Sequence, residues 1–218
     1  MKLREQERDL YVKCTVRTGE QESGCVIRRS HTNVVRLEKN GQTVWEKGAE
    51  HESAGDDSLV ETLKEMTIAG IRSVVDTASE EELSFLLTGV EMNERLAAYS
   101  EKIPASVGLT DALRRENDTS LLANDLMTRI LVKVSSAAES RLDGCPLPTM
   151  SSSGAGTKGL VVILPVSEAA DVLGVSGVKK VRALALAHLI NRYINAYIGK
   201  LSPMCTCVMA ASTAAAVG

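Results

Sequence analysis

The sequence has very few aromatic residues. Only 3% of its 218 residues are aromatic: one tryptophan, one phenylalanine and four tyrosines. The core must therefore be built from alanine, valine, leucine and isoleucine, and a base-stacking surface for single-stranded nucleic acid is not expected. A basic excess is lacking too, because 25 basic residues stand against 28 acidic ones and the net charge is −3. We therefore expect no nucleic-acid partner.

Long hydrophobic runs are also missing from the sequence. The longest uncharged apolar stretch, residues 208–217, is too short to span a bilayer, and charges occupy the N-terminal positions where a signal peptide would be apolar. We expect a cytoplasmic protein with no membrane partner. In that reducing compartment an odd number of cysteines favours free thiols or metal ligands over a disulfide framework. The five cysteines are Cys14, Cys25, Cys145, Cys205 and Cys207.

Hydrophobic periodicity divides the chain into two parts. Residues 1–48 contain short β-branched runs, and Asn40-Gly41 between two of them is typical of a β-hairpin turn. From residue 56 to 218 the period becomes helical. The pattern therefore predicts an α+β fold, with a small N-terminal antiparallel sheet followed by a mostly α-helical domain.

Within the second part we predict one helix over residues 58–74, a second capped by Ser79 with Glu82, a third over 120–139 and a fourth over 176–198. Residues 160–166 form a short apolar, strand-like run that Pro165 ends. Ser202-Pro203 begins a last helix, which stops in mid-pattern at Gly218 and predicts a chain truncated at its C-terminus.

A loop rich in glycine, serine and proline covers residues 144–159. Its Gly154–Gly159 segment matches the G-x-G-x-x-G pattern letter for letter. A dinucleotide site needs a strand before this pattern and a helix after it, whereas we expect a helix and a loop before and a strand-like run after. A P-loop is not favoured, because Gly159 rather than serine or threonine follows Lys158. Two interpretations remain: a loop whose free N–H groups hold carboxylates or phosphates, and a plain connector.

Two further features have both a functional and a structural interpretation. Cys205 and Cys207 fall in the first turn of the last predicted helix, where the helix dipole favours thiolate. Residues two apart on a helix point in different directions, so we do not expect both to bind one metal ion; the alternative is two small buried hydrophobes. One stripe of the 176–198 helix is either a polar seam facing a site or a solvated face. It consists of His188, Asn191, Arg192 and Asn195.

Three segments resemble one known family. Residues 30–35 and 38–41 read SHTNVV and EKNG, similar to HTN(I/V)V…E(K/R)NG. Residues 141–144 and 147–159 read RLDG and LPTMSSSGAGTKG, similar to R-M-x-G-x-x-L-P-x-M-S-N-S-G-S-G-N-Q-G. Residues 185–190, 197–202 and 205–207 read ALAHLI, YIGKLS and CTC, similar to A-L-A-x-L-I…Y-I-G-R-L-S-x-x-C-G-C. The chain thus resembles the L-cysteine desulfidase family, which is related to the alpha chain of iron–sulfur L-serine dehydratase.

The resemblance implies an amino-acid lyase. Family members are thought to hold a 4Fe–4S cluster through three cysteines and to eliminate sulfide or water from Cβ of L-cysteine or L-serine, giving pyruvate and ammonia. Cys207 matches the first cluster cysteine, with Cys205 as the fallback. The loop would hold the carboxylate of the small-molecule substrate. The substrate-binding residues it implies are Ser151, Ser152, Ser153, Gly154, Gly156 and Gly159.

The chain also departs from the family pattern. The A-L-G-C-T-E-P segment that carries the proposed base and the C-D-G-A-K-A-G-C-like segment with two cluster cysteines have no match, and Thr157-Lys158 replaces Asn-Gln. We therefore expect the middle part of a family member, inactive and unable to hold the cluster alone. The alternative is a non-catalytic remnant, or a binding subunit completed by another chain; a homo-oligomer is also open. We further expect the polar stripe to approach the loop at 151–159.

Overall fold

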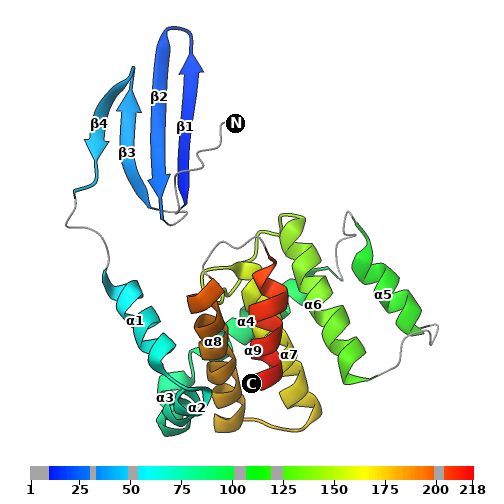
Figure 1. Cartoon of the computed structure of the whole chain (residues 1–218). Coiled ribbons are helices and arrows are strands. Elements are labelled where there is room, and N and C mark those ends of the chain that lie inside the picture. The colour runs from blue at the N-terminus through cyan, green and yellow to red at the C-terminus, as the bar shows by residue number, and fades with distance from the viewer. Residues whose placement is uncertain (1–9, 30–32, 49–53, 101–106, 119–124, 199–203) are drawn as a thin grey trace. The chain divides into compact units, whose positions relative to one another are not determined.

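The computed structural model describes residues 10–29, 33–48, 54–100, 107–118, 125–198 and 204–218. Four strands come first and helices follow, which confirms the predicted α+β class (Figure 1). The contacts divide the chain into two compact units, residues 1–57 and 58–218. His31, Leu121, Leu122, Ser202 and Pro203, for which the sequence made predictions, lie outside the described residues.

The first unit holds a four-stranded antiparallel sheet in the order β1-β2-β3-β4. Its strands are β1 (Tyr11–Thr18), β2 (Gln21–Arg28), β3 (Val34–Lys39) and β4 (Gln42–Glu46). Asn40 and Gly41 connect β3 to β4 with φ of 48° and 78°. Both tolerate the left-handed region that a two-residue hairpin turn requires, so the predicted turn is confirmed.

The first four helices are α1 (Ala54–Glu65), which spans the boundary between the two units, α2 (Ile68–Thr77), α3 (Glu80–Leu83) and α4 (Leu86–Tyr99). The single helix predicted over residues 58–74 is wrong. Thr67 takes an extended conformation and accepts a hydrogen bond from the Gly70 N–H, so it caps a new helix there. The predicted capping box of Ser79 and Glu82 is present at α3.

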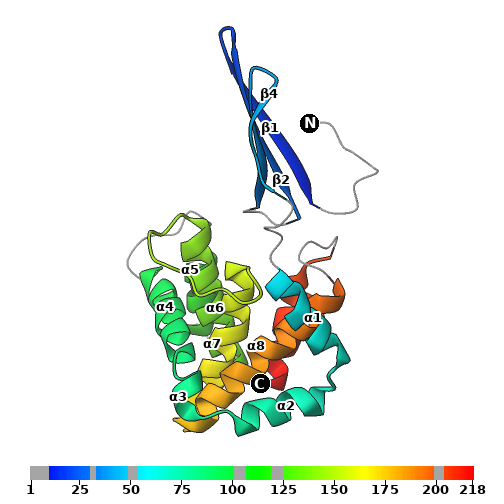
Figure 2. The same cartoon turned by 90° about the vertical axis from the view of Figure 1, so that its left-hand side faces the viewer.

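The remaining helices are α5 (Leu109–Asp118), α6 (Leu126–Leu142), α7 (Gly156–Val172), α8 (Val178–Ile198), the π-helical η2 (Cys207–Ala211) and α9 (Ser212–Val217). The strand-like run at residues 160–166 is wrong, because it lies inside α7 and Pro165 does not end the helix. α7 contacts α4, α6, α8 and α9, and it lies between α6 and α8 in Figure 2. A helix covered on all sides is apolar all round, which hides the 3.6-residue period.

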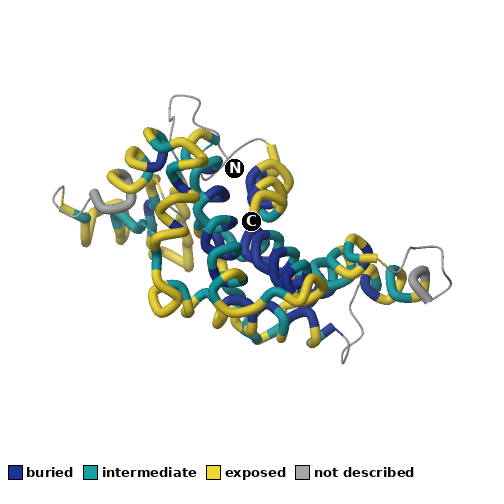
Figure 3. The backbone as a smooth tube through the Cα atoms, turned by 90° about the horizontal axis from the view of Figure 1, so that it is seen from below, coloured by how far each residue is buried: buried dark blue, intermediate teal, exposed yellow. Residues whose placement is uncertain are grey.

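Two apolar clusters form the core on either side of α7. One joins Ile163 of α7 to Ile71, Leu184 and Ile190, and the other joins Leu160 and Leu164 to Leu96 of α4. The sheet contributes one fully buried apolar side chain, Val26, among the described residues, so most of the buried chain in Figure 3 belongs to the helices. α7 is therefore the central element that fixes the loop in front of it.

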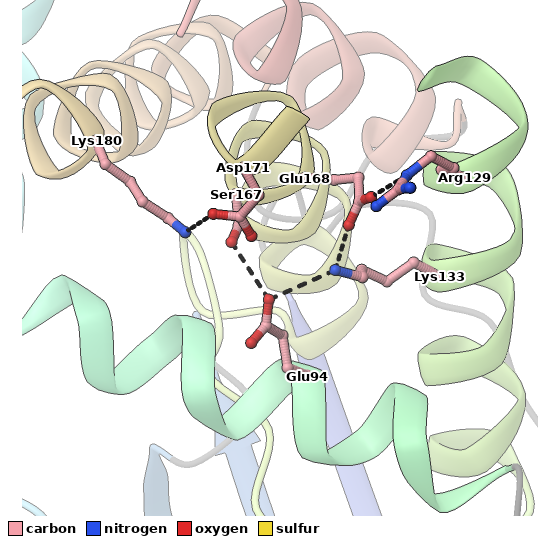
Figure 4. A network of polar contacts seen from close by, with 7 residues as sticks. All are labelled: Glu94, Arg129, Lys133, Ser167, Glu168, Asp171 and Lys180. Carbon is pink, nitrogen blue, oxygen red and sulfur yellow. Dashed lines mark hydrogen bonds and ion pairs between the residues drawn. The ribbon is translucent and has the colours of Figure 1, made fainter. Parts of the chain in front are cut away.

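An ion-pair network around one buried carboxylate anchors the far half of α7. Glu168 is 3% exposed; its Oε1 lies 2.5 Å from Arg129 Nε, and its other oxygen contacts Lys133 Nζ. Glu94 joins the network through Lys133 and the Ser167 hydroxyl (Figure 4). Burial raises the pKa of Glu168, but the hydrogen bonds from Lys133 and Arg129 outweigh it and hold that pKa below its ordinary value. The network links α4, α6 and α7.

Candidate functional site

The loop between α6 and α7 starts at a left-handed glycine. Asp143 ends α6, Gly144 has a φ of 81°, and the Cys145 N–H donates to the Ser140 carbonyl, so these residues form a helix-end turn. Before α7 the chain makes a tight turn in which Ser152 and Ala155 exchange backbone hydrogen bonds. The two residues between them, Ser153 and Gly154, have φ of 50° and 74°. This serine turn, residues 152–155, presents the hydroxyls of Ser152 and Ser153 immediately before α7.

The glycines at residues 154, 156 and 159 differ in how much space surrounds their Cα atoms. Gly154 faces open space, whereas a Cβ on Gly156 would lie 2.8 Å from Arg141 Nε. A Cβ on Gly159 would lie only 1.9 Å from the Met150 carbonyl oxygen. Gly159 therefore lets α7 pack directly on the incoming loop, and its position faces that loop's backbone.

The polar stripe of α8 contacts the serine turn, as expected from the sequence. His188 Nδ1 lies 3.0 Å from Ser152 Oγ, and Asn191 Nδ2 donates to the hydroxyls of Ser152 at 2.7 Å and Ser153 at 3.1 Å. Asn191 and Ser152 are buried. Burial lowers the pKa of His188, so its imidazole is neutral at pH 7. The interpretation of this stripe as a solvated face is therefore wrong.

Lys158 extends this network toward the C-terminal part of the chain. It is 3% exposed, and its Nζ donates to Asn195 Oδ1 at 2.5 Å. Asn195 donates in turn to the Oδ1 of Asn191 at 2.9 Å. A continuous buried chain thus runs from Lys158 through both asparagines to Ser152. Burial lowers the pKa of Lys158, while the nearby thiols of Cys207 and Cys205 act in the opposite direction.

Cys205 and Cys207 lie at the start of the last helical segment, and the prediction that they diverge is wrong. Each thiol affects the pKa of the other, so the two sulfurs lie close together. The spacing argument assumed that both residues are helical, but η2 begins at Cys207 and Cys205 precedes it. The backbone N–H groups of Val208 and Cys207 lower the pKa of Cys205, and burial raises that of Cys207. Cys205 is therefore the thiol that ionises first.

The described residues do not supply a complete cluster site. Among them no group of three or more histidine, cysteine, aspartate or glutamate side chains is placed to hold a metal ion. A cubane cluster is usually held by four thiolates, with fewer where an iron is left open to substrate. The Cys205–Cys207 turn offers two, so these residues alone do not fit the group.

Asn93 of α4, which the sequence did not single out, holds the loop from the other side. It is fully buried, accepts from the Met150 N–H at 3.0 Å and donates to the Met150 carbonyl at 3.3 Å. The available signal was an amide on the otherwise apolar buried face formed by Gly89, Val90, Leu96 and Ala97. Asn93 and Gly159 together fix Met150, two residues before Ser152.

We expect Asn93→Ala to destabilise the protein by about 2–4 kcal/mol, because it removes the side-chain partner of both the N–H and the C=O of the partly buried Met150. Urea unfolding followed by circular dichroism measures the change. Glu91→Ala, at an exposed position of the same helix, is the matched control and should change stability by less than about 0.5 kcal/mol. Equal effects of the two variants would contradict this role of Asn93.

Comparisons with known proteins place this arrangement in a family. A sequence profile of the serine dehydratase alpha chain matches residues 20–218. The chain belongs to the serine dehydratase alpha chain family. The match includes the serine turn, the polar stripe of α8 and the Cys205–Cys207 turn. No solved structure matches this family member.

Several curated relatives of this alpha chain family member are named UPF0597 proteins. One from Clostridium tetani is 35% identical over 218 residues, covering 100% of this chain and 50% of the relative. One from Desulfotalea psychrophila is 36% identical, covering 98% of this chain and 50% of the relative. A third, from Caldanaerobacter subterraneus, is 34% identical over 211 residues. The chain therefore spans about half the length of the curated relatives it matches. None of its described helices is both long and apolar enough to cross a membrane.

Proposed function

We propose that this chain contributes the substrate-binding half of a lyase that eliminates the Cβ substituent of L-cysteine or L-serine. The observation that carries the proposal is the buried chain of hydrogen bonds from Ser152 to Lys158, whose ammonium interacts electrostatically with the thiols of Cys205 and Cys207. A small zwitterionic substrate needs an anion-binding group and a fixed polar pocket close to the metal that activates it.

The serine turn supports the binding of a carboxylate. α7 begins at Gly156, and its N-cap residue Ala155 offers no capping side chain. The Ser153 hydroxyl accepts from Asn191 and can donate its own proton to an anion beside the first N–H groups of α7, where the helix dipole favours negative charge. Neutral His188 and the Asn191 amide hold the Ser152 hydroxyl in one orientation. In this proposal the substrate carboxylate binds at the turn formed by residues 151–156.

The cysteine turn supports a metal-ligand role for Cys207, with Cys205 as the fallback. The neighbouring Lys158 ammonium stabilises negative charge on both thiols. A 4Fe–4S cluster, when bound, would supply the Lewis acid that activates the leaving group. Because two thiols do not complete its ligand set, the cluster would need further ligands from outside the described residues of this chain. A binding subunit without catalysis is the second candidate, favoured by Lys158 in place of the family amide.

A chimera tests the proposal in the context of a full-length relative. This chain replaces the segment that it matches in the Clostridium tetani relative, and both proteins are purified anaerobically and reconstituted with iron and sulfide. We expect the chimera to bind about four irons and to form pyruvate from L-cysteine or L-serine, and the chain alone to do neither. Cys207→Ser should remove the iron from the chimera, whereas Cys145→Ser should retain it.

The outcomes separate the candidates. A folded chimera without pyruvate formation, beside an active relative, would favour the binding subunit. An inactive relative would overturn the lyase proposal for the family member as a whole. About four irons with turnover in the chain alone would show that a ligand set is complete without a partner.

A further inference from the structure

The sheet of the first unit has two chemically different faces. Residues directly opposite each other on neighbouring strands point to the same face. One row across all four strands consists of Lys13, Val26, Arg36 and Glu46. Lys13 and Arg36 of this row form ion pairs with Glu38, which lies on the same face. The adjacent row, on the other face, consists of Cys14, Cys25, Leu37 and Trp45.

Cys14 and Cys25 are direct partners in this second row. They are opposite each other in the β1–β2 pair, both are free thiols, and Cys14 is exposed while Cys25 is half-buried. Opposite residues in an antiparallel pair have Cα atoms about 4.5–5.5 Å apart. A disulfide requires a Cα separation of about 4.4–6.8 Å, so the register holds the two backbones at a separation that a disulfide can span.

We propose that Cys14 and Cys25 form a vicinal dithiol that closes reversibly into a disulfide by exchange with a small disulfide such as oxidised glutathione. The thiolate of Cys14, the more exposed of the pair, attacks one sulfur of glutathione disulfide; a mixed disulfide forms and one glutathione thiolate leaves. The thiolate of Cys25 then attacks the Cys14 sulfur, and the second glutathione leaves as thiolate. The protein dithiol loses two electrons and two protons, and the glutathione disulfide is reduced to two thiols.

The neighbours of the pair favour closure over a lasting mixed disulfide. Val12 and Val16 flank Cys14 on the same face and are 44% and 60% exposed, and Leu37 lies beside Cys25. In a mixed disulfide, the charged glutathione bound to Cys14 would cover these apolar side chains, whereas a disulfide to Cys25 adds no polar group. The second thiol is also held in place by the strand pairing, so its attack is intramolecular and fast.

Peptide mapping of the complete chain tests this site. Trypsin cleaves after Lys13, Arg17 and Arg28, so Cys14 and Cys25 fall in separate peptides, residues 14–17 and 18–28. The protein is incubated with oxidised glutathione, blocked with N-ethylmaleimide, digested and analysed by mass spectrometry. We expect the linked pair of peptides to exceed mixed glutathione disulfides at either cysteine by about tenfold, and dithiothreitol to abolish it.

The control changes the face of the sheet and keeps the strand. In the variant Cys14→Ser with Thr15→Cys, the new thiol lies opposite Gly24 on the charged face, and we expect no link to Cys25. Mixed disulfides that persist at Cys14, full alkylation of both cysteines after oxidation, or a link of equal yield in the control variant would each overturn the proposal.

Discussion

Replacing Gly159 by alanine should cost more than about 4 kcal/mol and leave the helical unit unfolded or barely stable. The added Cβ would lie 1.9 Å from the Met150 carbonyl oxygen and 2.8 Å from the Met150 carbonyl carbon. Both are backbone atoms, and Asn93 holds that same carbonyl in place. No side-chain rotation relieves the overlap, so α7 must move away from the loop and lose packing in both apolar clusters.

Gly154→Ala is the matched control for this prediction. Gly154 lies in the loop, five residues before Gly159 of α7, and has open space around it, but its φ is 74°. Alanine there should cost about 1 kcal/mol of backbone strain without a steric clash. Circular dichroism and thermal unfolding of both variants measure the difference. A Gly159→Ala protein as stable as the Gly154→Ala protein would show that the loop yields easily.

The parts of the fold that the sequence predicts correctly depend on local chemistry. Asn40-Gly41 determines its turn through the backbone freedom of two residues, and Ser79 with Glu82 caps α3 through bonds within one helical turn. α7 is different, because its apolar run is read equally well as a strand until the helices around it are known. Burial on every side is a tertiary property that the sequence pattern does not report.

The candidate site shows the same division. The four-residue polar stripe on α8 is visible in the sequence from helical spacing, and its contact with the serine turn followed from the family resemblance of both segments. The thiols of Cys205 and Cys207 could not be placed, because their directions depend on where the last helical segment begins. Lys158 and Asn195 are 37 residues apart in the sequence, and no local sequence pattern predicts that they form a hydrogen bond.

In the ion-pair network around Glu168, removing the two cations should destabilise the protein much more than removing the carboxylate. Removing both cations with Arg129→Met and Lys133→Met leaves a carboxylate that is 3% exposed without its ion pairs. We expect this double variant to lose about 3–5 kcal/mol at pH 7. Glu168→Gln should lose only about 1–2 kcal/mol, because Arg129 is 56% exposed and Lys133 27% exposed, so water can solvate both cations.

The pH dependence of these losses distinguishes a stranded charge from lost packing. In the parent protein the pKa of Glu168 lies below its ordinary value of 4.5, so its stabilisation is complete above pH 4.5 and disappears as the pH falls further. Without the two cations burial acts alone and raises this pKa above 4.5. The folded double variant then takes up a proton before the unfolded chain does, and its deficit shrinks as the pH falls from 7 toward 4.5.

Chemical denaturation at a series of pH values measures both behaviours. The deficit of Glu168→Gln should stay constant down to about pH 4.5, while that of the double variant should narrow over the same interval. Adding Glu168→Gln to the double variant should restore most of the lost stability at pH 7, because it removes the unpaired charge. A deficit of the double variant that does not change with pH, together with no rescue by Glu168→Gln, would show that the methionines disturb packing and that the ion pairs contribute little.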